Sequence, residues 1–334
     1  MALPDTEYAY AVARVRANEH SLLSAAELDA LIAAPSYDAA VQQLRGKGWA
    51  LHTTPVTAAD DIFALWEEMD VAVWRLLEES APDIKLFYPL IAANDFFNLK
   101  AALKAVFSGL EPESYCRTPS VTPLELIAEA AAQKRFELLP THLREAAEAA
   151  YDALARVGSG QLAEIIIDRA ALNNTLQLAR EGQIPQLVQW AEQLAAAANI
   201  KIALRCAQTG KSLDFTLRAM GQGSWLDNKQ LTAAALEGHK ALADYLRTTP
   251  CAAAAEALSL AQGSRAALER WSDSISPLLL AQAQSTAFGP APLIAYYLRG
   301  RAELKTVRII LLAKRVGVSE AALRTRCVQR AGGQ

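Results

Sequence analysis

Apolar residues along the chain recur three and four positions apart, which is the spacing of one face of an α-helix. Leu28, Leu31 and Ile32 form one such stretch. The segment 8–15 alternates with a period of two, as a strand would, but its alanine content favours a helix. The pattern therefore predicts an all-α fold that contains many helices of medium length.

Residues that cap helices stand in front of several apolar stretches. Ser24 and Glu27 have the spacing of a capping box, in which each side chain bonds the backbone of the other residue. Thr122 and Pro123 predict a helix that is capped by the threonine and has the proline as its first residue. Glycine and proline clusters predict tight connections at 46–48, 158–160, 221–223 and 289–292.

One pattern of residues occurs three times, at starts that lie about a third of the chain apart. From each start, an aliphatic residue follows at +1, a basic residue at +2, leucine at +5 and glycine at +11. The pattern describes a helix of about three turns that ends at glycine and buries the +1 and +5 side chains. The copies are Asn98 with Leu99, Lys100, Leu103 and Gly109; Asn199 with Ile200, Lys201, Leu204 and Gly210; and Thr306 with Val307, Arg308, Leu311 and Gly317.

Three helical units that each leave an apolar face uncovered must bury those faces against one another. We therefore predict three similar helical domains, at residues 1–118, 119–222 and 223–334, with the first helix of the chain shared with the last domain. Their expected arrangement is pseudo-threefold, as a ring or funnel.

Composition and charge exclude several classes of protein. The chain has 334 residues, of which 52% are hydrophobic, and a formal net charge of -3 at pH 7. Such a chain can bury a sizeable core, and a dedicated nucleic-acid binder would normally carry a strong basic excess. Apolar runs stay shorter than the roughly 20 residues that cross a bilayer, and the N-terminus does not resemble a secretion signal. We therefore expect a soluble cytoplasmic protein, or one that sits on a membrane without entering it.

Residues that could carry chemistry are scattered along the sequence. The four cysteines and four histidines show no metal-ligand spacing, so we expect neither a metal nor a cofactor. The segment 209–212 resembles the end of a phosphate loop, but Arg205 stands where that motif requires its first glycine. We therefore predict a protein that is not an enzyme and has no small-molecule substrate.

The charges are distributed unevenly. The segment 60–83 holds eight acidic residues and one basic residue, whereas 299–330 holds nine basic and two acidic residues. The two segments could pair with each other or remain solvated, or they could contact oppositely charged partners. Within the repeated pattern, like charges stand four positions apart, which is unfavourable in an isolated helix, so we expect acidic groups to face them. These pairs are Lys100 with Lys104 and Lys201 with Arg205.

Four segments together resemble one known family. They are YAYAVARVR at 8–16, DFFNLK at 95–100, ELKTVR at 303–308 and KRVG at 314–317. Their order and spacing resemble those of the C-subunit family of V-type and archaeal-type rotary ATPases, which is called the d-subunit family in eukaryotes. The resemblance extends over nearly the whole chain.

This resemblance implies a funnel of three helical domains that acts as a spacer in the rotor on the cytoplasmic side of the membrane. Its partners would be the membrane proteolipid ring and the central stalk, in a machine that transports protons or sodium ions. In the third copy, Leu312 stands where the other copies have a basic residue, so the stalk contact would differ there. We predict that seven basic residues line the funnel or its rim and contact the stalk: Lys100, Lys104, Lys201, Arg205, Arg308, Lys314 and Arg315.

Two other functions remain open at this point. An α-helical adaptor or scaffold for other partners is the main alternative, although a solenoid would show a repeat of about 34 to 47 residues, which we do not find. A helical enzyme would need polar groups that converge in a closed pocket.

Overall fold

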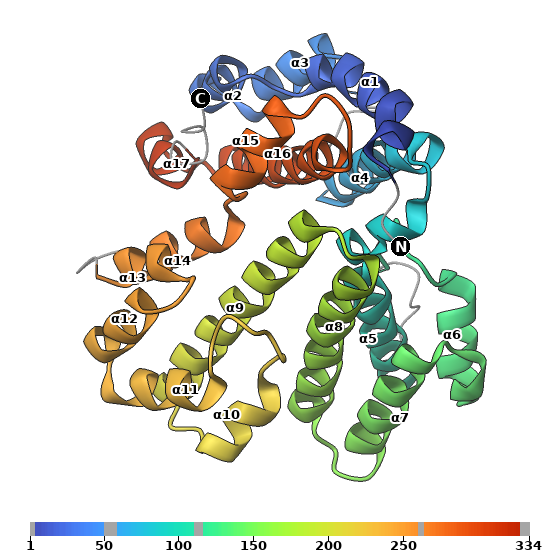
Figure 1. The fold of residues 1–334 in the computed structure, drawn as a ribbon, viewed down its shortest axis with the longest axis vertical. Helices are drawn as coiled ribbons and strands as arrows, with labels where there is room; N and C mark the ends of the chain where they lie inside the picture. The colour runs from blue at the N-terminus through green and yellow to red at the C-terminus, as the bar shows by residue number, and fades with distance from the viewer. Residues whose placement is uncertain (1–3, 50–58, 110–115, 260–263, 328–334) are drawn as a thin grey trace. The chain divides into compact units, whose positions relative to one another are not determined.

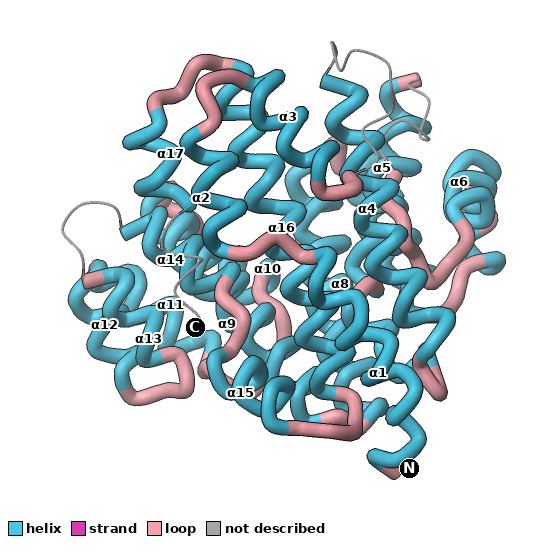
Figure 2. Tube along the Cα trace, turned by 90° about the horizontal axis from the view of Figure 1, so that it is seen from above, coloured by secondary structure: helices cyan, strands magenta, loops and turns pink. Residues whose placement is uncertain are grey.

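The computed structural model describes residues 4–49, 59–109, 116–259 and 264–327, and these residues form helices and loops without a strand (Figures 1 and 2). The prediction of an all-α fold is therefore confirmed. By its internal contacts the chain divides into two compact units. The middle unit contains Lys85–Ser272, and the terminal unit combines Leu3–Ile84 with Asp273–Gln334.

The middle unit is built around the long helix α8, which packs against α5, α7 and α9 (Figure 1). Shorter helices α11 and α12 follow α9, and α11 packs against it. The elements of this part of the chain are η3 (Ile84–Leu90), α5 (Ala92–Ser108), α6 (Leu124–Gln133), η5 (Phe136–Leu138), α7 (Thr141–Ala155), α8 (Gly160–Gly182), α9 (Pro185–Gln208), α10 (Leu213–Ala219), α11 (Asn228–Glu237), α12 (His239–Arg247), α13 (Ala252–Leu258) and α14 (Ser264–Asp273).

The terminal unit is built around α16, which packs against α1, α3, α4 and α15. Segments from both ends of the chain therefore share one unit. The segment 8–15 is helical, as predicted from its alanine content. The elements are η1 (Asp5–Tyr8), α1 (Ala9–Asn18), η2 (Glu19–Ser21), α2 (Ala25–Ala33), α3 (Tyr37–Gly46), α4 (Ala59–Ser80), α15 (Pro277–Ser285), α16 (Ala291–Arg315) and α17 (Glu320–Cys327).

Of the two predicted caps, one forms and one does not. Ser24 and Glu27 make the reciprocal bonds of a capping box at the start of α2. The prediction for Thr122 was wrong, because Pro123 is the cap residue and α6 begins one position later than expected. The backbone N–H and the hydroxyl of Thr122 both bond the buried carboxylate of Asp95, so the hydroxyl does not cap the helix.

Three clusters of buried apolar residues in the described part of the chain each hold the +1 and +5 positions of one copy of the repeated pattern. One cluster joins α5 to α6, α7 and α8, another joins α9 to α11, α12 and α13, and another joins α16 to α2, α3 and α17. The three copies therefore have similar surroundings. The domain boundaries at 118 and 222 and the funnel arrangement stay predictions. The buried pairs are Leu99 with Leu103, Ile200 with the half-buried Leu204, and Val307 with Leu311.

Glycine at +11 ends the motif helix in each copy, as predicted. Gly109, Gly210 and Gly317 have φ angles of 70°, 64° and 73°, in the left-handed region that favours glycine. Gly109 is the C-cap of α5, and the other two stand one residue beyond the C-caps of α9 and α16.

Candidate functional site

A buried asparagine holds the connector that follows the motif helix in the first two copies. Asn98 donates from Nδ2 to the carbonyl of Arg117 at 2.9 Å and accepts the N–H of the same residue at 2.6 Å. Asn199 makes the same two bonds with Gly221, both at 2.9 Å. A primary amide can do this because it carries a donor and an acceptor side by side. Thr306, at this position in the third copy, donates to a carbonyl of its own helix at 2.8 Å.

A carboxylate on the motif helix also accepts backbone N–H groups from the connector. Asp95 on α5 is 1% exposed and accepts the N–H groups of Val121 and Thr122 at 2.8 and 2.9 Å. Burial raises the pKa of Asp95, and the three hydrogen bonds to the carboxylate oppose that rise. Glu192 on α9 is 3% exposed and accepts the N–H of Ser224 at 2.7 Å through Oε2. Both carboxylates therefore fix the chain shortly before the next helix.

Glu303 on α16 occupies the corresponding place in the third copy. Its Oε2 accepts the N–H of Leu23 at 2.6 Å, just before α2 begins. Burial is the main cause that raises the pKa of Glu303 to about 7. Asp95 and Glu303 both lie three positions before the start of the pattern, which is a signal that the sequence contained and that our sequence reasoning missed. In the second copy Glu192 lies seven positions before the start.

The structure places three of the seven predicted contact residues in ion pairs within the middle unit. The acids that face these lysines come from α8 and α14. Lys100 and Lys201 each reach an acid 68 positions further along the chain, so the repeated pattern extends to the acidic partner. These pairs are partly exposed and contribute little to stability. The pairs are Lys100 with Asp168, Lys104 with Glu164 at 2.6 Å, and Lys201 with Glu269 at 2.9 Å.

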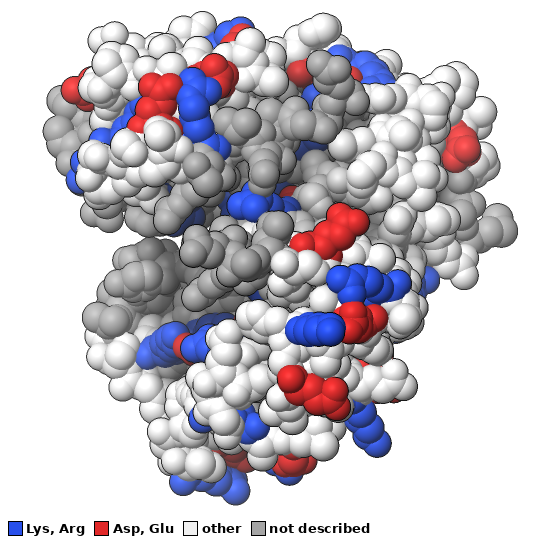
Figure 3. All heavy atoms as spheres, turned by 90° about the vertical axis from the view of Figure 1, so that its left-hand side faces the viewer, with Lys and Arg blue, Asp and Glu red and all other residues white. Residues whose placement is uncertain are grey.

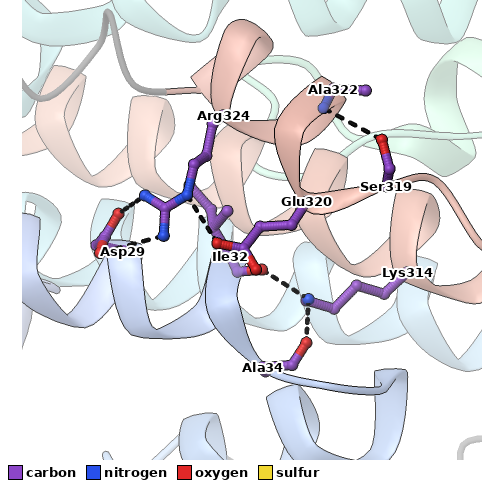
Figure 4. Close-up of polar contacts among 8 residues, drawn as sticks. All are labelled: Asp29, Ile32, Ala34, Lys314, Ser319, Glu320, Ala322 and Arg324. Carbon is purple, nitrogen blue, oxygen red and sulfur yellow. Dashed lines mark hydrogen bonds and ion pairs between the residues drawn. The ribbon is translucent and has the colours of Figure 1, made fainter.

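Lys314, a fourth predicted contact residue, lies at the C-terminal end of α2 (Figure 4). Its ammonium donates to the carbonyls of Ile32, at 2.8 Å, and Ala34. Carbonyls at a helix end lack partners within the helix, and a cation there is favourable. Burial lowers the pKa of Lys314. This side chain therefore joins α16 to α2 within the terminal unit.

Arg324 on α17 also contacts α2 (Figure 4). Its guanidinium pairs with Asp29 on α2 and, at 2.8 Å, with Glu320 on its own helix. The C-terminal helix is thereby tied to a helix from the start of the chain.

The remaining three predicted contact residues are distributed over two units. Arg205 on α9 is exposed and makes no ion pair with another residue that the structure describes. Arg315 is exposed at the end of α16, and Arg308 is half-buried, which lowers its pKa. No contact between any of the seven residues and a stalk has been tested, so that assignment stays a prediction.

The two oppositely charged segments meet in the terminal unit. Arg301 on α16 pairs with Asp70 on α4 at 3.0 Å, which supports the interpretation that the segments partly pair with each other. The side chains at 60, 61, 67 and 68 lie outside the described part of the chain. On the face shown in Figure 3, lysine and arginine side chains lie among aspartate and glutamate side chains.

The segment that resembled a phosphate loop is a turn between two helices. Gly210 follows the end of α9, and Ser212 accepts the N–H of Phe215 at 3.2 Å as the cap of α10. A phosphate loop would connect a strand to a helix. Across the described ranges, no group of three or more histidine, cysteine, aspartate or glutamate side chains is placed to hold a metal ion.

A cavity of about 290 Å³ that opens to solvent lies in the terminal unit. Its walls come from the end of α1, the loop after α3, and the helices α4 and α16. Leu76 and Leu304 are among its apolar residues, and Trp49 and Glu303 are among those with polar atoms. The sequence alone contained no sign of this cavity, because its residues come from four separate segments.

Comparison with known proteins assigns the chain to a family. The family model of the ATP synthase (C/AC39) subunit matches residues 11–326. The chain belongs to this family. It is 22% identical over 258 residues to the C subunit of the V-type sodium ATPase of Enterococcus hirae, an alignment that covers 77% of this chain and 79% of that protein. The resemblance predicted from the four segments is therefore confirmed.

Family and relative together indicate the C subunit of a V-type ATPase, which is a member of a complex and not its catalytic part. Membership of such a complex implies that the partners of this chain are other ATPase subunits. Among the residues described for this C/AC39 subunit, no helix combines the length and the apolar character that a membrane span requires.

Proposed function

We propose that this C/AC39 subunit is a spacer of the central rotor, which couples the central stalk to the membrane proteolipid ring and performs no chemistry itself. It would act on the cytoplasmic side of the membrane during transport of protons or sodium ions. The observation that carries the proposal is the family match over residues 11–326. The repeated helical core supports it, because a spacer needs stiff, similar parts.

We rank the seven predicted stalk contacts by the partners that they already have within the chain. Lys100, Lys104 and Lys201 already pair with acids of this chain, and Lys314 caps a helix end. A partner would have to compete for these four groups. Arg205 has no such ion pair among the described residues, so it is the strongest candidate for a contact with an acidic partner surface.

A pull-down from membranes in mild detergent tests the proposal. The full chain should bring down the subunits of the stalk and those of the proteolipid ring. The double variant Arg205→Glu and Arg315→Glu should lose the stalk, whereas the matched exposed variant Arg156→Glu should retain it. Recovery of neither the stalk nor the ring with the unaltered chain would refute the rotor role and favour an adaptor for other partners.

A further inference from the structure

The third copy of the repeated pattern leaves one carboxylate oxygen open where the other copies use both. Asp95 accepts the N–H of Val121 through one oxygen and that of Thr122 through the other. Glu192 accepts Ser224 N–H through Oε2 and the guanidinium of Arg180 through Oε1 at 2.6 Å.

Glu303 uses only Oε2, for the N–H of Leu23, and its Oε1 has no hydrogen-bond partner among the residues that the structure describes. Glu303 is half-buried, and this oxygen is not one of the buried polar atoms that lack a partner in the described part of the chain, so it keeps contact with solvent. Glu303 is also the member of the three that lines the 290 Å³ cavity. A carboxylate oxygen that can accept a further donor therefore borders a space that a small molecule could enter.

A second wall of the same cavity carries an unused donor. Trp49 is 3% exposed and lines the cavity, and its indole Nε1–H is buried without an acceptor in the described part of the chain. A buried N–H without a partner costs free energy comparable to a lost hydrogen bond. One solvent-accessible acceptor and one buried, unsatisfied donor thus border the same cavity, between apolar walls that include Val73, Leu76 and Leu304.

We propose that the terminal unit binds a small organic amine that also carries an oxygen, with its ammonium on Oε1 of Glu303 and its oxygen on Nε1–H of Trp49. The chemical class is that of the short amino alcohols. This inference does not depend on the rotor role.

Size and charge limit the ligand. The cavity volume lies at the lower end of the range for small-molecule sites, so a short aliphatic chain between the two polar groups fits and a nucleotide does not. Two charged residues of the wall are already paired within the unit, Lys47 with Glu27 and Glu79 with Arg14. Arg75 also lines the cavity but is exposed, so solvent screens its charge from an ammonium group.

Ligand-detected NMR with the full chain tests the proposal. The probes are amino alcohols of two to five carbons, the alkylamines of equal length, and the alcohols without an amine. At least one amino alcohol should bind, and its alcohol counterpart should bind at least about tenfold more weakly, because a charge-assisted hydrogen bond is lost.

Two variants assign the two contacts. Glu303→Gln should weaken binding of the amine by about tenfold or more, and its amide oxygen can still accept the N–H of Leu23. The Trp49→Phe variant lacks the indole N–H, so it should bind an amino alcohol and the alkylamine of equal length with the same affinity. Glu256→Gln, an exposed carboxylate on α13, is the matched control and should bind as the unaltered chain does.

Binding should also strengthen as the pH rises from 6 to 8.5, because the ammonium requires the ionised form of Glu303, whose pKa is about 7. The charged and titratable groups near Glu303 are Glu27 on α2, Lys47 after α3, Arg75 and Glu79 on α4, Glu19 on η2, and Tyr296 and Arg299 on α16. Failure of every amine to bind the unaltered chain, or unchanged binding by Glu303→Gln, would overturn the proposal.

Discussion

Replacing Asn199 with alanine should destabilise the middle unit more than the same change at Asn98. Asn199 is 2% exposed, and its amide bonds both backbone groups of the buried Gly221 as well as Oδ1 of Asn228 at 3.0 Å. The carbonyl of Gly221 keeps a bond from Nδ2 of Asn228 at 3.0 Å in the variant. The N–H of Gly221 has no such replacement, so it is left buried and unpaired.

The magnitude follows from that unpaired group. The buried Gly221 N–H that loses its partner costs about 1–3 kcal/mol, and each of the two other lost hydrogen bonds adds about 1 kcal/mol, so Asn199→Ala should cost about 3–5 kcal/mol. Asn98→Ala should cost about 1–2 kcal/mol, since Arg117 lies at the exposed surface and water can replace the lost partner. Gln177→Ala removes an exposed amide on α8 and should cost about 0.5 kcal/mol or less.

Hydrogen exchange measured by mass spectrometry is the suitable assay, because a chain of two units need not unfold in one step. The peptide that contains 220–224 should lose protection in Asn199→Ala, and the peptide that contains 116–122 should lose it in Asn98→Ala. Urea unfolding of the three variants gives the order of stability. Equal effects for Asn199→Ala and Gln177→Ala would refute the reasoning that the buried amide holds the connector.

Three further predictions concern single residues. Gly109→Ala should lower the free energy of unfolding by about 1 kcal/mol in urea titrations, because a side chain is unfavourable at a φ of 70°. Gly300→Ala should cost about 1–3 kcal/mol in the same assay, because its Cβ would meet both methyl groups of Val73 at 3.1 Å; no loss would show that α4 can move away. Glu303 has its pKa raised from 4.5 to about 7, so its stabilising effect is present below pH 4.5 and is lost as the pH rises through 7. Glu303→Gln should therefore match the unaltered chain near pH 4 and exceed its stability by up to about 3 kcal/mol at pH 8, and a difference independent of pH would contradict this.

Part of the candidate site could be predicted from the sequence. The repeated pattern located Asn98 and Asn199, and it correctly placed glycine at each helix end. The amide bonds of the two asparagines could not be predicted, because their partners lie 19 and 22 positions away in connectors without a regular pattern. The wrong prediction at Thr122 has the same cause, since its backbone N–H and its hydroxyl both bond Asp95, which lies 27 positions before it.

The sequence by itself determined the helices, the capping box at Ser24 and the three copies of the buried apolar pair. These features depend on hydrogen bonds and side-chain spacing within about four residues, which the local sequence specifies. Only the tertiary structure decided which acids face Lys100 and Lys201, that both ends of the chain build one unit, and that Glu303 borders a cavity. Such contacts join residues tens to hundreds of positions apart, and they exist only once whole helices have packed and excluded water from the groups between them.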